Sequence, residues 1–250
     1  MDVKTPAYLL SHTKTDTHIL DVGCDNRLTT INFAKLVPRG QVIGVDCRRN
    51  AIDTANEAAL SQNITNTKFI YGDKHVLPFP NESFDIVHTY QLLVHLPYSD
   101  PVDALKEMRR VCKTGGLVST RVSDWPTAVV YPLIPGVKEA LDLIVHCICR
   151  HKGTSPYGGR LREWARTAGL PKENIVASAV VIYHANPRQT RLWGEFMATI
   201  LENTDFLGKS VSLGLVSQQN LVDMSSGWRR WSAHDDAFFS IVNCQMICKK

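Results

Sequence analysis

The first half of the chain alternates short apolar runs with segments of helical spacing. Five runs typical of buried strands occupy residues 18–22, 41–45, 67–71, 84–88 and 117–122. Between them, apolar residues recur on one helical face at residues 28–36, 50–60 and 101–112, and Asn50 is the expected N-cap of the second helix. Such alternation predicts an α/β protein whose mostly parallel, doubly wound sheet carries helices on both faces.

The pattern changes after about Asp124. We expect a loop and a helix over 125–150, a Gly/Pro/Ser-rich loop over 151–159 and a short helix over 160–167. A strand over 175–184, helices over 187–203 and 218–232 and a strand over 237–248 follow. We interpret residues 1–125 as a cofactor-binding core. Residues 126–250 are then a helical substrate cap with terminal strands that complete the same domain.

Composition narrows the class of protein. With 44% hydrophobic and 21% charged residues among 250, the chain can bury a sizeable core. The net charge of +4 is small and scattered, which argues against a nucleic-acid or membrane partner. No apolar stretch reaches the length of a membrane span, and the N-terminus lacks the apolar core of a signal peptide, so we expect a cytosolic protein.

The seven cysteines show no spacing typical of a metal site or a disulfide framework. They include no CxxC pair, and Cys147 and Cys149 have no second pair of ligands at zinc spacing. We therefore expect mostly buried, reduced thiols and no metal.

Polar residues gather just after the predicted strands. Parallel sheets bind ligands beyond the carboxyl ends of their strands, so these positions are the candidate site. They are residues 23–27, Asp46, Asp73 and residues 88–91.

Several stretches together resemble a known family. They are ILDVGC at 19–24, VIGVD at 42–46, YGDKHVLPFPNESFDIVH at 71–88, LLVHLPY at 92–98 and EMRRVCKTGG at 107–116, with GGRLREWARTAGL at 158–170, WGEF at 193–196 and GWRRW at 227–231. The chain resembles class I S-adenosylmethionine-dependent methyltransferases, in particular small-molecule enzymes related to ubiquinone and menaquinone biosynthesis and their fungal and actinobacterial members. The resemblance implies a Rossmann-like sheet with an inserted helical cap, and S-adenosyl-L-methionine as cofactor.

The resemblance and the strand ends together suggest which residues bind the cofactor. Asp46 suits the ribose diol, Asp73 and the Lys74 amide suit the adenine, and N–H groups of the glycine turn suit the carboxylate. Alternatively, Asp46 and Asp73 only cap a helix or a turn. The full expected set is Asp21, Gly23, Cys24, Asp46, Cys47, Gly72, Asp73, Lys74 and His88.

The glycine turn departs from the family pattern. Asp25 and Arg27 stand where members have glycine, and Asn26 lies between them. Asp and Asn tolerate left-handed backbone, so the turn can still form. The Asp25 carboxylate then faces the cofactor carboxylate, binds the cofactor amino group, or is offset by Arg27.

The substrate side carries fewer signals. His95 and Asp124 are the candidate catalytic bases, and Tyr90, Gln91, Trp125 and Tyr131 the candidate substrate-binding residues. A His among leucines is also often only a packed residue. We expect the tryptophan-rich region over 124–240 to enclose an apolar pocket, with a cleft bordered by Tyr90, His95 and Trp125. Trp228 and Trp231 suit packing between elements.

Three functions fit these observations. The first is methyl transfer to a small apolar or aromatic secondary metabolite. The second is a non-methylating step on the same fold, such as a cyclisation, isomerisation or pericyclic reaction. The third is a non-catalytic partner protein. For the first two functions, the expected ligand is a small-molecule substrate. The sequence does not indicate an oligomeric state.

Overall fold

The computed structural model describes residues 7–25, 28–96, 100–149, 158–202, 210–212 and 214–250. The chain divides into two units. The sheet unit comprises residues 2–122, 159–178 and 244–250, and the helical unit comprises residues 123–158 and 179–243. The chain thus returns to the sheet unit twice after residue 122, while the predicted domain division at residue 125 stays a prediction.

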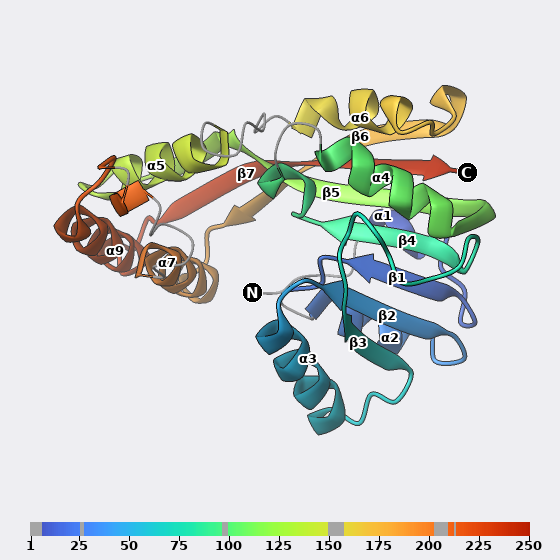
Figure 1. The fold of residues 1–250 in the computed structure, drawn as a ribbon. Helices are drawn as coiled ribbons and strands as arrows, with labels where there is room; N and C mark the ends of the chain where they lie inside the picture. The colour runs from blue at the N-terminus through green and yellow to red at the C-terminus, as the bar shows by residue number, and fades with distance from the viewer. Residues whose placement is uncertain (1–6, 26–27, 97–99, 150–157, 203–209, 213) are drawn as a thin grey trace. The chain divides into compact units, whose positions relative to one another are not determined.

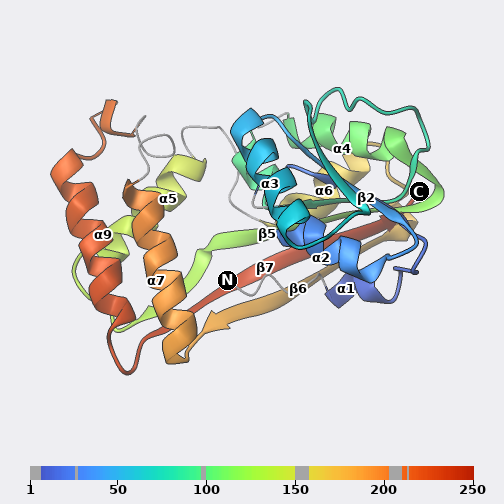
Figure 2. The ribbon, with the colours of Figure 1, turned by 90° about the horizontal axis from the view of Figure 1, so that it is seen from below.

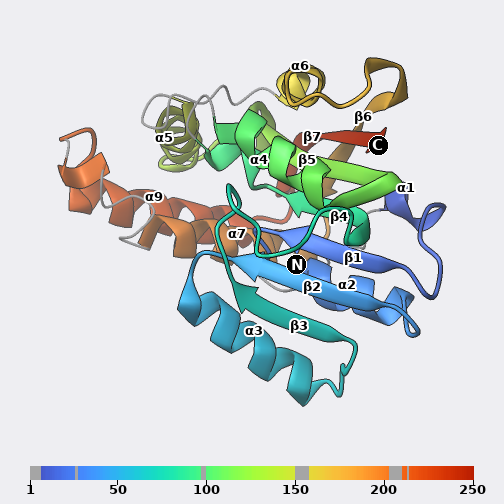
Figure 3. The ribbon, with the colours of Figure 1, turned by 45° about the vertical axis from the view of Figure 1, so that its right-hand side comes forward.

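Among the described residues, seven strands form one sheet in the order β3-β2-β1-β4-β5-β7-β6 (Figures 1 and 3). Neighbouring strands from β3 to β5 pair in parallel. This arrangement confirms the predicted Rossmann-like, mostly parallel sheet. The strands are β1 (His18–Val22), β2 (Gln41–Asp46), β3 (Thr67–Tyr71), β4 (Phe84–Tyr90), β5 (Cys112–Tyr131), β6 (Ile175–His184) and β7 (Phe238–Lys249).

Helices of the sheet unit cover both faces of the sheet, because successive side chains of a strand point to opposite sides. On one face, Ile19 and Ile86 pack with Leu9 and Phe33 of the first two helices. On the other face, strand residues such as Val87 pack against the helices at Asp100–Val111 and Leu161–Thr167. The helices are α1 (Ala7–Leu10), α2 (Leu28–Leu36), α3 (Arg49–Ser61), α4 (Asp100–Val111) and α6 (Leu161–Thr167), with short turns η1 (Leu93–His95), η2 (Gly158–Arg160) and η3 (Lys172–Asn174).

Two expectations about these elements are wrong. β5 continues to Tyr131, where we expected a loop from Trp125, because the β-branched and aromatic residues after Pro126 extend the strand. α3 begins at Arg49, and its N-cap Arg48 makes no side-chain cap, so Asn50 lies inside the helix. Trp164 is buried in the core of the sheet unit, because it shares one face of α6 with Leu161.

The helical unit contains α5 (Val137–Cys149), α7 (Pro187–Glu202) and α9 (Gln218–Ser232). Ser217 begins α9 with a capping box shared with Asn220. α7 and α9 lie side by side (Figures 1 and 2), and Gly194 permits this approach. A Cβ atom at Gly194 would lie 2.4 Å from the Ser232 Cβ atom. As predicted, Trp228 and Trp231 pack between elements, in the core of this unit.

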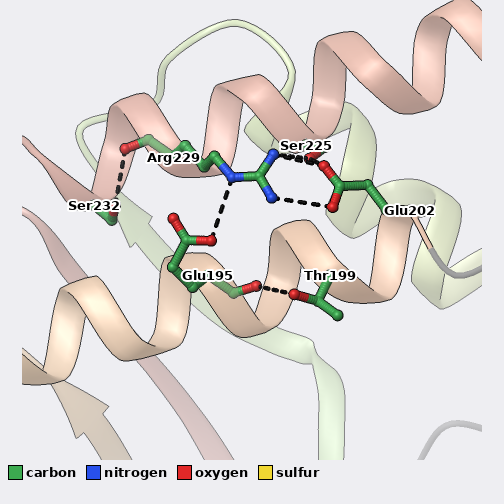
Figure 4. Close-up of polar contacts among 6 residues, drawn as sticks. All are labelled: Glu195, Thr199, Glu202, Ser225, Arg229 and Ser232. Carbon is green, nitrogen blue, oxygen red and sulfur yellow. Dashed lines mark hydrogen bonds and ion pairs between the residues drawn. The ribbon is translucent and has the colours of Figure 1, made fainter.

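An ion-pair network of partly exposed side chains joins α7 to α9 (Figure 4). The Arg229 guanidinium donates to Glu202 at 3.0 Å and to Glu195 at 3.3 Å, and the Ser225 hydroxyl donates to Glu202 at 2.7 Å. The Arg229 and Ser225 hydrogen bonds lower the pKa of Glu202 from its usual 4.5 to about 2.

Replacing Arg229 with glutamine is expected to lower the free energy of unfolding by about 1 kcal/mol, because solvent screens these partly exposed groups. Glu202 has a depressed pKa in the folded chain, so its contribution is complete above pH 4.5 and is lost as the pH falls towards 2. Urea titrations should show the difference at pH 7 and a smaller one near pH 3. Arg230→Gln is the control, since Arg230 contacts the Pro135 carbonyl. An equal loss in both variants would contradict the network's role.

Most of the described cysteines are buried and none forms a disulfide. Cys47 is exposed, Cys244 is half-buried, and burial raises the pKa of Cys112 to about 12. Within the described ranges, no three metal-ligating side chains cluster, and no helix is long and apolar enough to cross a membrane.

Candidate functional site

The turn after β1 keeps its glycine conformation at one position. Gly23 has φ +73°, and a Cβ atom there would lie 3.1 Å from the Leu92 side chain, so both its backbone and its surroundings require glycine. The N–H groups of Gly23 and Cys24 donate to the Val45 carbonyl at 2.8 and 3.1 Å. These N–H groups, which we expected to face a cofactor carboxylate, are therefore engaged in holding the turn to β2.

Asp46, the last residue of β2, is tied to the same turn. One carboxylate oxygen accepts the Asp25 N–H at 3.0 Å. The other accepts the Arg48 N–H at 3.0 Å and the Arg48 Nε–H at 3.3 Å. The Asp46 side chain is only 6% exposed. Asp46 thus caps backbone N–H groups, as the alternative interpretation required, and still lies at the expected end of β2.

Arg48 forms an ion pair with the Asp25 carboxylate. Burial lowers the pKa of Arg48, but the hydrogen bond and charge of Asp25 and the charge of Asp46 raise it overall. Arg48 therefore offsets the unusual acidic residue of the turn. We expected Arg27 as the candidate for this task, and Arg27 lies outside the described residues. No local sequence signal links Asp25 to Arg48, because the sheet brings them together.

The segment after β3 places Asp73 at a second strand end. Asp73 is exposed, and its Oδ1 atom accepts the His75 N–H at 2.9 Å, which lowers the Asp73 pKa. The His75 ring lies between Asp73 and Asp100, with nitrogen–oxygen distances of 3.2 and 3.5 Å. Gly72 donates its N–H to the Asp46 carbonyl at 3.1 Å, which joins this segment to the end of β2, and Lys74 is half-buried beside Asp73. Sequence reasoning missed the bridging His75.

A buried pair of polar side chains, Asp21 and His88, lies close to the turn after β1. The His88 ring nitrogen Nδ1 lies 3.0 Å from Asp21, and the Thr30 hydroxyl donates to the other Asp21 oxygen at 2.6 Å. Both Asp21 and His88 are almost inaccessible, at 2% and 0% exposure, and His88 contacts the Phe33 ring edge-on. In this arrangement both residues hold the sheet and α2 together, and their contact with a cofactor stays a prediction.

The end of β4 carries a strained residue. Gln91 has φ +60°, which is rare for a residue other than glycine and is typical of functional segments. Its N–H donates to the Arg121 carbonyl at 2.8 Å. Tyr90 precedes it and is half-buried, and His95 ends η1, also half-buried. The structure thus brings Tyr90, Gln91 and His95 to the segment that follows β4.

The remaining predicted residues belong to the helical unit. Burial raises the pKa of the Asp124 carboxyl. Trp125 stacks on Trp193 at 6.5 Å between ring centres, and Tyr131 is 59% exposed. The expected cleft combines residues of both units, so it stays a prediction.

The donor and acceptor set at the end of β2 fits a ribose diol. A carboxylate offers about four lone-pair positions, of which Asp46 uses two for backbone N–H groups and one for the Arg48 Nε–H. Arg48 is 53% exposed and is also held by Asp25, so its long bond to Asp46 is replaceable. The two hydroxyl groups of a ribose diol can then donate to the remaining acceptor positions of the Asp46 carboxylate.

Comparisons with known proteins indicate the family of this chain. A family model described as a methyltransferase domain matches residues 19–116. An uncharacterized methyltransferase, C1B3.06c of Schizosaccharomyces pombe, is 36% identical over 97% of this chain and 88% of its own length. ltbC of Aspergillus luteorubrus, also described as a methyltransferase, is 27% identical over 98% and 89%.

Solved structures share the fold. A Bacillus halodurans protein assigned to the methyltransferases superposes with a TM-score of 0.61 and 16% identity, covering 97% of both chains. The [4+2]-cyclase SpnF gives a TM-score of 0.53 and 17% identity, covering 95% of this chain and 79% of its own.

Proposed function

Because the chain belongs to the class I S-adenosylmethionine-dependent methyltransferases, a family of enzymes, we propose that it methylates a small secondary metabolite with S-adenosyl-L-methionine as cofactor. The observation that carries this proposal is the end of β2. There, Asp46 is tied to the Gly23 turn through the Asp25 N–H, and it has one free acceptor position and a second that the Arg48 Nε–H can give up to a diol. The choice of a secondary metabolite rests on the resemblance to fungal small-molecule enzymes.

The residues that we propose as cofactor ligands have separate tasks. Asp46 accepts the ribose hydroxyls, and Asp73 with the Lys74 amide binds the adenine. Gly23 leaves room beside Leu92, where any side chain would be crowded. Cys47, exposed after Asp46, and Gly72 line the same segment. When bound, the cofactor supplies an electrophilic methyl group.

For the substrate we propose, in the sheet unit, Tyr90 and Gln91 as contacts and His95 as the base. In the helical unit we propose Trp125 and Tyr131 as contacts and Asp124 as the alternative base. The raised pKa of Asp124 suits proton removal from an acceptor oxygen, nitrogen or carbon. Precise alignment of acceptor and methyl donor supplies much of the rate enhancement in such reactions. The cytosolic location and the lack of a nucleic-acid or membrane partner stay predictions.

Label transfer tests the proposed function. The full chain is incubated with S-adenosylmethionine carrying a labelled methyl group and a panel of small aromatic and apolar metabolites. We expect label in a product with the parent chain and a large loss with Asp46→Ala. Conversion of a metabolite without label transfer would favour the non-methylating alternative. If no metabolite of the panel is labelled or converted, and the chain does not bind the cofactor, both enzymatic functions are contradicted.

Replacing Asp25 with glycine is expected to tighten binding of S-adenosylhomocysteine by a modest factor, at most about fivefold. The change removes a carboxylate near the proposed site and frees Arg48 for the cofactor carboxylate, but both groups are largely exposed and screened. Calorimetric titration measures the change, and Asp25→Asn separates the loss of charge from the added backbone freedom. Weaker binding in both variants would show that Asp25 is itself a ligand.

A further inference from the structure

The sheet face under α1 and α2 turns from apolar to polar towards the ends of β4 and β5. Register pairs place Ile86 beside Leu117, then His88 beside Ser119, then Tyr90 beside Arg121. The first pair packs in the core with Leu9 and Phe33. The next two pairs lie on the same face, because alternate residues of a strand point to the same side. Four polar side chains therefore follow one another at the carboxyl end of these strands.

Several buried polar atoms on this face lack a hydrogen-bond partner of good geometry within the described part of the chain. They are Tyr8 Oη, His88 Nε2, Ser119 Oγ and Arg121 Nε, although Tyr8 and Ser119 lie close enough to influence each other. They come from α1, β4 and β5. His88 and Ser119 are fully buried, at 0% exposure. Buried polar atoms are nearly always paired in native proteins, so a cluster of unpaired ones from separate elements points to a ligand.

Arg121 gives the cluster its charge. Its guanidinium carbon lies 5.8 Å from the centre of the Tyr90 ring, and no ion pair between described residues includes Arg121. Asp21, an acidic group in the interior near Tyr8, is already engaged by His88 and Thr30. A partly buried guanidinium without a carboxylate is a binding group for an anion.

Tyr8 completes the donor set. Burial raises the pKa of Tyr8, an effect that the charge of Arg121 and the neighbouring Ser119 hydroxyl only partly oppose. The phenol therefore keeps its proton and can donate it to an oxygen ligand. Tyr8, Ser119 and Arg121 then offer several donors, while Asp21 nearby disfavours a dianion such as phosphate.

We propose that Arg121, Tyr8 and Ser119 form a subsite for the carboxylate group of a small-molecule substrate. The planar guanidinium fork matches the two oxygens of a carboxylate, and the two hydroxyl groups add donors beside it. The Tyr90 ring forms a wall of the subsite. The inference rests on the proposed function, because it names the substrate class of the same reaction.

Benzoate and benzamide are the probes, since they share a shape and differ in charge. Calorimetry or ligand-observed NMR measures their binding to the full chain, with and without saturating S-adenosylhomocysteine. We expect the parent chain to bind benzoate more tightly than benzamide. Arg121→Gln is expected to weaken benzoate binding roughly tenfold or more, and Tyr8→Phe several-fold, without affecting benzamide. Arg39→Gln, at an exposed arginine that donates to Thr15, is the matched control and should change nothing.

Equal affinity for benzoate and benzamide, no benzoate binding by the parent, or no loss in both Arg121→Gln and Tyr8→Phe would overturn the subsite. If the Arg121→Gln variant does not fold, benzoate binding by Tyr8→Phe alone tests the subsite. Titration of S-adenosylhomocysteine into the same variants separates this inference from the proposed function. Arg121-dependent benzoate binding without any cofactor binding would support the subsite and contradict methyl transfer. Normal cofactor binding with equal affinity for benzoate and benzamide would contradict the subsite and leave the proposed methyl transfer supported.

Discussion

Replacement of Asp46 by alanine is expected to weaken S-adenosylhomocysteine binding by about 1.5–3 kcal/mol, the range for hydrogen bonds to a charged group. The proposed ribose contacts are lost with the carboxylate. The Asp25 and Arg48 N–H groups also lose their acceptor, which loosens the turn after β1. Because both effects act at one place, we expect this to be the largest effect of any single substitution on cofactor affinity.

Two further variants show whether the effect is specific. Asp46→Asn keeps one acceptor oxygen and should lose less affinity than Asp46→Ala. Asp85 is a matched control, because it too accepts a backbone N–H, from His18, and pairs with a cation, Lys113. It lies at the amino end of β4, away from the proposed site. Asp85→Ala should bind the cofactor normally, and normal binding by Asp46→Ala would show that the ribose assignment is wrong.

Replacement of His88 by leucine is expected to lower the free energy of unfolding by about 1–3 kcal/mol, the usual cost of leaving a buried polar group without one of its hydrogen-bond partners. The Asp21 carboxylate would keep only the Thr30 hydroxyl in a nearly inaccessible site. Urea denaturation of the parent and the variant measures the difference.

His88→Asn is the matched control for this prediction. The asparagine amide can donate to Asp21 roughly where the His88 Nδ1 atom lies, so part of the stability should return. A leucine variant as stable as the parent would show that the pair contributes nothing. An asparagine variant no better than leucine would show that packing against Phe33, and not the hydrogen bond, is what His88 provides.

The sheet and most of its helices follow from the sequence, because hydrophobic periodicity is local information. The strand over 175–184 and the helix over 218–232 were predicted with the bounds that the structure has. β5 was predicted too short, since Pro126 and the polar residues before it resemble a break while strand pairing depends on neighbours elsewhere. A prediction from glycine, proline and polar residues along the chain does not include the stabilisation that neighbouring strands provide.

The candidate site also contains contacts that depend on tertiary structure and that the sequence pattern does not predict. The strand ends that carry Gly23, Asp46 and Asp73 are legible, because parallel topology collects them at one edge of the sheet. The pairing of Asp25 with Arg48, and the bridge from Asp73 through His75 to Asp100, depend on loop paths after the strands. The cluster around Arg121 depends on strand register and on α1. Spacing along the chain gives no signal for any of them.

Calorimetric titration of S-adenosylhomocysteine into the full parent chain tests the central claim most directly. The account predicts saturable binding of one cofactor molecule per chain, which Asp46→Ala weakens and Asp85→Ala leaves unchanged. Absence of binding by a folded parent chain at about 1 mM cofactor, where even an affinity of about −4 kcal/mol would be visible, would contradict it.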